Sequence, residues 1–235
     1  MTDLFESATG FRALVIGAGG AIGQAFVSAL QQDPRCVHVE PVSRSQGSGF
    51  DLLDEPSVAA QARASAAAGP YQLIVDATGA LTIDGVGPEK SLAALQPDLL
   101  AKAFALNAIG PVMVLRHFAP LLAAGPSIYA KLSARVGSIS DNHKGGWYGY
   151  RASKAAMNML LQTAAIELQR KNAQLRVVAL QPGTVRSELS RPFAAGVSKL
   201  LEPAESVAGM LAALHGLEAR SGAHFVDYQG QEVPW

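Results

Sequence analysis

The chain has 235 residues, of which 49% are hydrophobic and 16% are charged, and its 19 basic residues balance 19 acidic residues. General nucleic-acid binders carry a clustered positive excess, so this balance argues against that class, and the apolar content argues against disorder. The single cysteine, Cys36, excludes an intramolecular disulfide and a cysteine-ligated metal cluster. The five histidines show no metal-ligand spacing, so no metal site is expected.

No stretch of the sequence reaches the roughly 18 uninterrupted apolar residues that a membrane span requires. The closest stretch is 108–124, which Arg116, His117 and two prolines interrupt. Asp3 and Glu6 precede the first apolar run, which is unlike the start of a signal peptide. We therefore expect a soluble cytoplasmic protein that binds neither membranes nor nucleic acid.

Short runs rich in β-branched residues alternate with longer stretches rich in alanine and leucine. In chain order, the sequence predicts strand 13–16, helix 21–31, strand 36–43, helix 57–68, strand 73–75, helix 97–122, strand 127–133, helix 148–171, strand 175–180, helix 203–215 and strand 224–227. Proline has no backbone N–H group, so it cannot donate the hydrogen bond that a residue inside a helix makes. The helix at 97–122 should therefore be irregular near Gly110 and Pro111.

Strands separated by helix-length segments are typical of βαβ units and a mostly parallel sheet, and such connections are right-handed. The predicted fold class is α/β, a doubly wound Rossmann fold. No linker divides residues 1–235, so we expect a single domain. The irregular loops at about 79–87, 138–149 and 182–200 follow successive strands, which would place them at the carboxyl edge of the sheet, where ligands bind.

The glycine-rich run from Gly17 to Gly23 follows the strand ending at Ile16 and opens a helix. A turn this tight needs residues without side chains, and the helix N-terminus offers free N–H groups and a partial positive charge to a diphosphate. An ordinary glycine-rich turn would look similar, but the strand before it and the helix after it favour dinucleotide binding.

The end of the second predicted strand carries Ser43 and Arg44. NAD-binding folds place a carboxylate near this point for the ribose hydroxyl, and none stands here. A guanidinium and a hydroxyl suit a 2′-phosphate instead, although a solvated surface arginine is the alternative. The pair therefore favours NADP(H) as the cofactor.

Tyr150 and Lys154 lie four residues apart and so share one face of a helix. A lysine ammonium at that distance would lower the pKa of the tyrosine from its usual value near 10. A phenol so tuned exchanges a proton near neutral pH. The same spacing also arises by chance at the start of an amphipathic helix.

These features occur in the order typical of the short-chain dehydrogenase/reductase family, which the chain resembles from about residue 12 to 230. The run from Ser133 to Asn142 with Gly145 to Trp147 is similar to the family's C-factor-like subgroup. The residues that match the family pattern are Gly17, Ala21 and Gly23; Asp51 and Leu52, which follow the third strand in the family; Asp76 to Gly79; Asn107; Tyr150 and Lys154; and Pro182 to Val185.

The resemblance implies roles for these residues. Tyr150 would exchange the proton, Lys154 would assist it and hydrogen-bond the nicotinamide ribose, and Asn107 would position a water that links Lys154 to solvent. The implied cofactor contacts are Gly17, Gly19, Gly20, Ala21, Ile22, Gly23, Ser43, Arg44, Asp51, Leu52, Ala77, Thr78, Gly79, Tyr150, Lys154, Pro182, Gly183 and Val185.

Three positions depart from the family pattern. Ile16 stands where many members have threonine, which should affect the stability of the turn more than the chemistry. Gly20 stands where many NADP-using members carry a basic residue, so Arg44 would hold the 2′-phosphate with less help. Ala134 stands at the usual position of the catalytic serine, and the neighbouring hydroxyls belong to Ser133 and Ser138. We expect Ser133 to polarise the substrate carbonyl, with Ser138 as the alternative and catalysis without a serine as the third case.

The sequence thus predicts an NADP-dependent oxidoreductase that interconverts a carbonyl and an alcohol on a small molecule. The alternative is a nucleotide-binding signalling or regulatory protein that keeps the fold and has lost fast turnover. The resemblance also implies a homodimer or homotetramer, built by the helices at 97–122 and 148–171.

Overall fold

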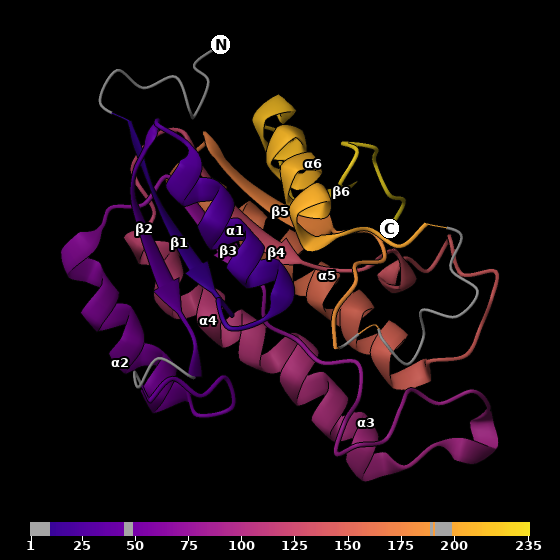
Figure 1. Ribbon diagram of the computed structural model, residues 1–235. Helices are drawn as coiled ribbons and strands as arrows, with labels where there is room; N and C mark the ends of the chain where they lie inside the picture. The colour runs from indigo at the N-terminus through magenta and orange to yellow at the C-terminus, as the bar shows by residue number, and fades with distance from the viewer. Residues whose placement is uncertain (1–9, 45–48, 189, 191–198) are drawn as a thin grey trace.

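A computed structural model describes residues 10–44, 49–188, 190 and 199–235. Six parallel strands form one sheet in the order β2-β1-β3-β4-β5-β6 (Figure 1). The order reverses direction between β1 and β3, which creates the crevice in which open α/β sheets bind ligands. The strands are β1 (Phe11–Ile16), β2 (Cys36–Val42), β3 (Leu73–Asp76), β4 (Ser127–Leu132), β5 (Leu175–Gln181) and β6 (His224–Asp227).

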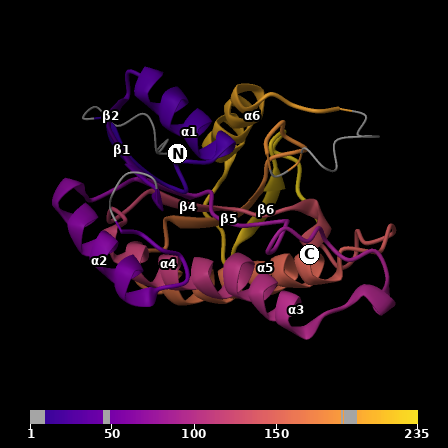
Figure 2. The ribbon, with the colours of Figure 1, turned by 60° about the horizontal axis from the view of Figure 1, so that its bottom comes forward.

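Helices cover both faces of this sheet. Figure 2 shows α1 (Ala21–Gln32) and α6 (Pro203–Gly216) side by side on one face. The opposite face carries α2 (Glu55–Ser65), α3 (Pro97–Phe104), α4 (Gly110–Phe118) and α5 (Tyr148–Gln169). The predicted doubly wound Rossmann fold is therefore confirmed.

Alternation along β1 explains how one strand supports two cores. Ala13 and Val15 face the core under α1 and α6, whereas Leu14 and Ile16 face the core under α2, α4 and α5. All four side chains are fully buried. Successive side chains of a strand point to opposite faces, so an almost continuous apolar run is what a strand covered on both sides requires.

The long helix predicted at 97–122 is interrupted, as expected. A π turn (Ala105–Ile109) joins α3 to α4, and a 3₁₀ turn (Ala119–Leu121) follows. The interruption ends at Gly110 and Pro111, which stand at the beginning of α4. The π turn buries Asn107 and Ala108, so the irregularity places a polar side chain inside the molecule.

The helical stretch Pro97–Leu121 is long and apolar enough, by length and composition, to cross a membrane. Within the fold, Val114 and Phe118 of this stretch are fully buried in the core beneath the sheet. One face of this stretch therefore packs against the core, while much of the rest is only partly buried.

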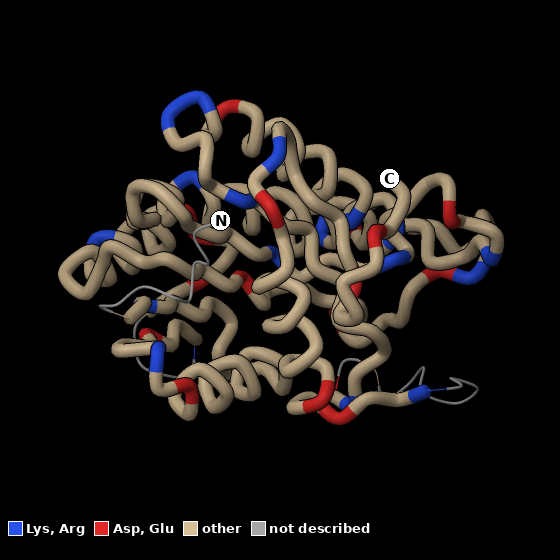
Figure 3. Tube along the Cα trace, turned by 90° about the horizontal axis from the view of Figure 1, so that it is seen from above, with Lys and Arg blue, Asp and Glu red and all other residues tan. Residues whose placement is uncertain are grey.

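Charged residues of both signs are interspersed along the described parts of the chain (Figure 3).

Candidate active site

The turn between β1 and α1 forms a tight cradle of backbone. Gly17 has φ +82°, and a Cβ on it would lie 2.9 Å from the carbonyl carbon of Ala77. A Cβ on Gly23 would lie 2.2 Å from the carbonyl oxygen of Gly17. The first glycine is therefore required by its backbone conformation and the second by helix–turn packing, as in dinucleotide-binding turns.

The N-terminus of α1 faces this cradle without a side-chain cap among the described residues. Its N-cap is Gly20, and its first turn contains no acidic residue. Ala21 and Ile22 are half-buried, so this end of the helix is only partly covered by the rest of the fold. Uncapped N–H groups and the helix dipole favour an anion here.

Ser43 and Arg44 lie directly after β2, whose Val42 carbonyl accepts hydrogen bonds from the amides of Gly17 and Ala18. The glycine turn and the end of β2 are thus neighbours, as the cofactor prediction requires. Ser43 is 5% exposed, while Arg44 is exposed.

The pair Asp51–Leu52 differs from its expected setting. In the family it follows a third strand, but the described residues before it, Gly49 and Phe50, are not in a strand, and residues 45–48 lie outside the described part of the chain. A turn and then α2 follow at once. Leu52 still lies inside the fold, because a Cβ on Gly110 would be 2.7 Å from its Cγ atom.

The loop after β3 connects the glycine turn to the π turn. The amide of Ala77 donates to the carbonyl of Ile16, and Ala80 exchanges two hydrogen bonds of 2.8 Å with the side-chain amide of Asn107. Gly79 lies between them with φ +139°, and a Cβ on it would lie 3.1 Å from Asn107 Oδ1 and 3.4 Å from Lys154 Nζ. Asn107 and Lys154 therefore both approach this loop at Gly79.

Tyr150 and Lys154 share one face of α5, and the Lys154 ammonium lies 5.6 Å from the centre of the Tyr150 ring. Lys154 Nζ donates to the carbonyl of Leu132 at 3.1 Å. Burial raises the pKa of Tyr150 to about 12, which is opposite to the lowering expected from the lysine. Burial, followed by the charge of Lys131, lowers the pKa of Lys154 to about 7, so the lysine is only partly charged at neutral pH.

The two candidate serines have different hydrogen-bond roles. Ser133 is buried and donates its hydroxyl proton to Asn158 Oδ1 at 2.6 Å. Ser138 is also buried, but its oxygen accepts from the amide of Asp141 at 3.0 Å, which leaves its proton to donate. The preference for Ser133 is therefore not supported by its geometry.

The loop at 182–185 closes the same edge of the sheet. Gly183 has φ +78°, and its amide donates to the side chain of Gln181. The carbonyl of Pro182 accepts from Ser206 Oγ at 2.6 Å, and Val185 is buried and bridges to Leu201. The segment 182–185 is thus anchored at both ends. Of the loop predicted at 182–200, residues 189 and 191–198 lie outside the described part of the chain.

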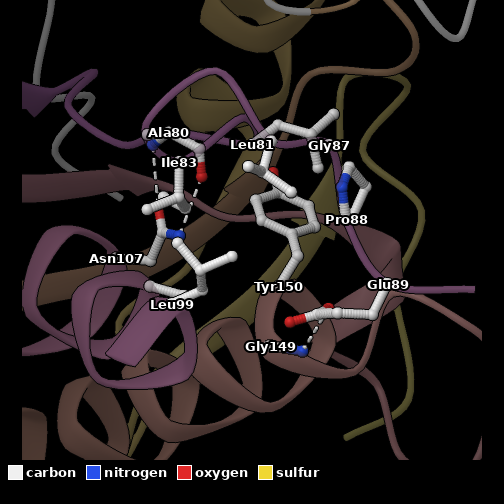
Figure 4. Close-up of a pocket in the computed structure, with 12 residues that line it drawn as sticks. Ala80, Leu81, Ile83, Gly87, Pro88, Glu89, Leu99, Asn107, Gly149 and Tyr150 are labelled. Carbon is white, nitrogen blue, oxygen red and sulfur yellow. Dashed lines mark hydrogen bonds between the residues drawn. The ribbon is translucent and has the colours of Figure 1, made fainter. Parts of the chain in front are cut away.

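A cleft with mostly apolar walls opens beside Tyr150 and Asn107 (Figure 4). Glu89 is the charged side chain in this cleft, and sequence reasoning missed it. Its carboxylate accepts from the amide of Gly149 at 3.0 Å, and its carbonyl accepts from the amide of Trp147. The cleft is lined by Ala80, Leu81, Ile83, Val86, Gly87, Pro88, Glu89, Leu99, Ala103, Asn107, Gly149 and Tyr150.

A buried ion pair lies below this site and was also not predicted. Lys131 on β4 and Asp76 at the end of β3 are both 0% exposed, and Lys131 Nζ lies 2.9 Å from Asp76 Oδ1. The same ammonium donates to the carbonyl and hydroxyl oxygens of Thr78 at 2.6 and 2.9 Å. No local sequence pattern signals this pair, because its members are far apart in the chain.

Taken together, the residues present fit a dinucleotide. The backbone cradle at Gly17 and Gly23 would be filled by any side chain, and it adjoins an uncapped helix N-terminus. Gly79 leaves similar space beside Asn107 and Lys154.

Known proteins resemble this chain in sequence and in fold. The family model for short chain dehydrogenase matches residues 12–197. The chain is 37% identical over 137 residues to C-signal of Myxococcus xanthus, covering 58% of this chain and 78% of that protein. It is 29% identical over 188 residues to 1-hydroxy-2-glutathionyl-2-methyl-3-butene dehydrogenase of Rhodococcus sp. (strain AD45), covering 80% of this chain and 79% of that protein.

Solved structures share the fold at low sequence identity. One is a short-chain dehydrogenase/reductase from Burkholderia multivorans with bound NADP, with TM-score 0.81, 24% identity, and coverage of 95% of this chain and 99% of that chain. Another is an NADPH-bound carbonyl reductase from chicken fatty liver, with TM-score 0.82, 21% identity, and coverage of 97% of each chain. With a family model that spans most of the sequence and a matching sheet, this chain belongs to the short-chain dehydrogenase family.

Proposed function

We propose that this protein is an NADP-dependent oxidoreductase that interconverts a carbonyl and an alcohol on a small molecule. The observation that carries the proposal is that Tyr150 and Asn107 line one cleft, while the loop at 77–80 joins this cleft to the backbone cradle at Gly17. Structures of similar fold with bound NADP or NADPH support this choice of cofactor.

The cofactor, when bound, supplies or accepts the hydride. The cradle at Gly17 to Gly23 and the N-terminus of α1 would hold its diphosphate. Ser43 and Arg44 would contact its 2′-phosphate, and Asp51 and Leu52 its adenine. The remaining cofactor contacts would come from the loops at 77–79 and 182–185.

Tyr150 would exchange the proton with the substrate oxygen. A phenol with a pKa of about 12 keeps its proton at neutral pH, so the resting protein is poised to donate it to a carbonyl.

Lys154 and Asn107 would support this proton transfer. Lys154, with a pKa of about 7, gains and loses a proton easily at neutral pH, so it is suited to restoring the proton that Tyr150 gives up. The side chain of Asn107 is held by two hydrogen bonds to the backbone of Ala80. Asn107 would position the water that links Lys154 to solvent.

Ser138 is the better candidate to hold the substrate oxygen, because its hydroxyl proton is not used in its bond to Asp141. Ser133 would instead support α5 through Asn158. Replacing each by alanine separates the roles: Ser138→Ala should lower turnover, whereas Ser133→Ala should lower thermal stability.

The test is NADPH oxidation against a panel of aldehydes, ketones and quinones. The Tyr150→Phe variant should lose at least about a hundredfold in turnover, the low end for general acid catalysis, and bind NADPH within a few-fold. Tyr148→Phe is the matched control, because it removes a neighbouring exposed phenol. Retained turnover in Tyr150→Phe would remove Tyr150 from the mechanism.

A second candidate function is nucleotide-dependent signalling with little or no turnover. The 37% identity to C-signal and the alanine at position 134 favour it. NADPH binding without oxidation of NADPH by any member of the panel would support this candidate over the first. We also propose that the protein is a cytoplasmic homodimer or homotetramer, which light scattering tests.

A further inference from the structure

The ion pair between Lys131 and Asp76 places two charged side chains in the fully buried interior of the fold. Removing an ion from water costs several kcal/mol, and an apolar pair in the same place is often at least as stable. The lysine uses its three N–H groups on Asp76 Oδ1 and on two oxygens of Thr78. Tyr129 adds a longer contact of 3.3 Å to Asp76 Oδ2. The pair is fully satisfied, fully buried and unexplained by packing.

The place of this pair is next to Lys154. Lys131 directly precedes Leu132, whose carbonyl receives the hydrogen bond from Lys154 Nζ at 3.1 Å. Asp76 begins the loop that reaches Gly79, where a Cβ would lie 3.4 Å from the same Nζ atom. Both partners of the ion pair thus belong to segments that lie beside the Lys154 ammonium.

We propose that the Lys131–Asp76 ion pair is a positioning element that adjusts the protonation of Lys154 beyond the effect of its burial. Lys131 places a second cation close to the Lys154 ammonium, and Asp76 and Thr78 fix that cation in place. The role in catalysis rests on the proposed function, whereas the effect on Lys154 itself does not.

The charges that face Lys154 allow this effect to be attributed. Burial is the largest cause of the lowered pKa of Lys154. Next to it, Lys131 on β4 lowers this pKa and Asp76 on β3 raises it, with the larger effect from Lys131. From its own helix, Lys154 faces Tyr150, and from the π turn it faces the uncharged Asn107. The 3₁₀ turn Arg135–Gly137 contacts it through Gly137, whose Cβ would lie 2.9 Å from Lys154 Cβ.

The ion pair also holds the loop that contains the rest of the site. The bonds from Lys131 to Thr78 fix the backbone just before Gly79 and Ala80. Ala80 in turn holds Asn107 through two hydrogen bonds. Loss of the pair should therefore change the state of Lys154 first and the position of Asn107 second.

The deciding measurement is the titration of Lys154 in the whole protein, labelled with ¹³C at the lysine Cε atoms and followed by NMR. The chain has seven lysines, so the Lys131→Met and Lys154→Met variants each remove one signal and assign it. In Lys131→Met, the midpoint of the Lys154 titration should rise by at least about one pH unit, because a cation is lost and Asp76 remains.

Because Lys131→Met leaves a buried carboxylate unpaired and can fail to fold, a second variant is needed. Asp76→Asn combined with Lys131→Met removes both charges. The midpoint should still rise, by less than in Lys131→Met, because the larger of the two effects is that of Lys131. Tyr129→Phe is the control: it touches the same carboxylate without a change of charge and should leave the midpoint in place.

The pH profile of NADPH oxidation with 4-nitrobenzaldehyde gives the second readout. Its falling limb should move to higher pH in the charge-free double variant and stay in place in Tyr129→Phe. An unmoved Lys154 midpoint in a folded double variant overturns the inference, even if turnover depends on Tyr150. A moved midpoint in a protein without turnover supports the ion pair's effect and contradicts only the proposed function.

Discussion

Tyr150 and Lys154 have pKa values displaced in opposite directions, and one cause, burial, dominates both. Desolvation disfavours the charged form of each group, so the phenol keeps its proton and the ammonium loses its proton more easily. The sequence motif alone suggested that the lysine charge would prevail. Removal from water is the larger effect on both groups.

The buried Lys154 should lower the stability of the fold, and its replacement by methionine should raise it. Its folded-state pKa is about 7 against 10.5 for an ordinary lysine, so below pH 7 a charged group is buried and the cost is full. Between pH 7 and 10.5 the folded state has released the proton, and the cost shrinks as the pH rises.

We expect Lys154→Met to raise the melting temperature by at least about 4 °C at pH 6, and by less at pH 9.5. Calorimetry at both pH values checks this, with the exposed Lys144→Met as the control. An equal gain at both pH values would contradict the assignment to the buried charge.

Arg44 should decide the choice of coenzyme. A charge-assisted hydrogen bond to phosphate contributes about 1.5–3 kcal/mol, and Gly20 supplies no second cation, so the lower half of that range applies. Arg44→Ala should therefore weaken NADPH about tenfold and leave NADH nearly unchanged. Titration at matched ionic strength measures both, with exposed Arg63→Ala as the control. Equal binding of NADPH and NADH by the unmodified protein would show that Arg44 does not select.

At the scale of elements, α5 depends on a residue from another loop. Its N-cap, Trp147, has φ +55° and ψ +44°, the left-handed region that is costly for a bulky side chain, and makes no side-chain capping bond. Glu89 supplies the missing acceptor to Gly149, and its charge suits the helix N-terminus. The N-terminus of the helix that carries Tyr150 is therefore held by Glu89, a residue that lines the cleft.

Glu89→Ala should lower the melting temperature by about 2–4 °C, as expected when a cap worth about 1 kcal/mol is lost. Glu89→Gln keeps the acceptor and loses the charge, so it should lower the melting temperature by less. The exposed neighbour Lys90→Ala serves as the control. Should Lys90→Ala and Glu89→Ala melt alike, the capping role would be wrong.

The alternation of strands and helices could be predicted from the sequence because it depends on local patterns. β6 was predicted at its observed residues, and the interruption near Gly110 followed from the proline beside it. The contacts of Glu89 and of Lys131 could not be predicted, because each partner lies more than fifty residues away. Likewise, no sequence pattern predicts which atom accepts the hydrogen bond from the Ser133 hydroxyl.

At the scale of the whole molecule, the outer face of α5 is apolar at two positions one above the other. Met159 is 66% exposed and Ile166 is 43% exposed, and Ile109 of the π turn is 56% exposed. Met157 and Leu161 of the same helix are buried in the core, so they form its inner face. These three exposed apolar residues mark the surface on which a second copy of the chain would pack.

We therefore expect a homodimer or homotetramer that Met159→Glu weakens, because the change would bury an unpaired charge at the contact. Light scattering at micromolar concentration measures the assembly. The control is Leu92→Glu, which changes another exposed apolar residue elsewhere, on the 3₁₀ turn Leu92–Ala94. A monomeric unmodified protein would contradict the expectation.

Because the π turn lies between α3 and α4, the position of Asn107 depends on the number of residues in this segment. A π turn contains one residue more than the α-helical turn that it replaces, and each helical residue turns the chain by about 100°. Deleting a single residue there would restore a regular helix and swing either Asn107 or the buried face of α4 away from its partners. Segments exchanged between this protein and its relatives should therefore keep their length here, even where their sequences differ freely.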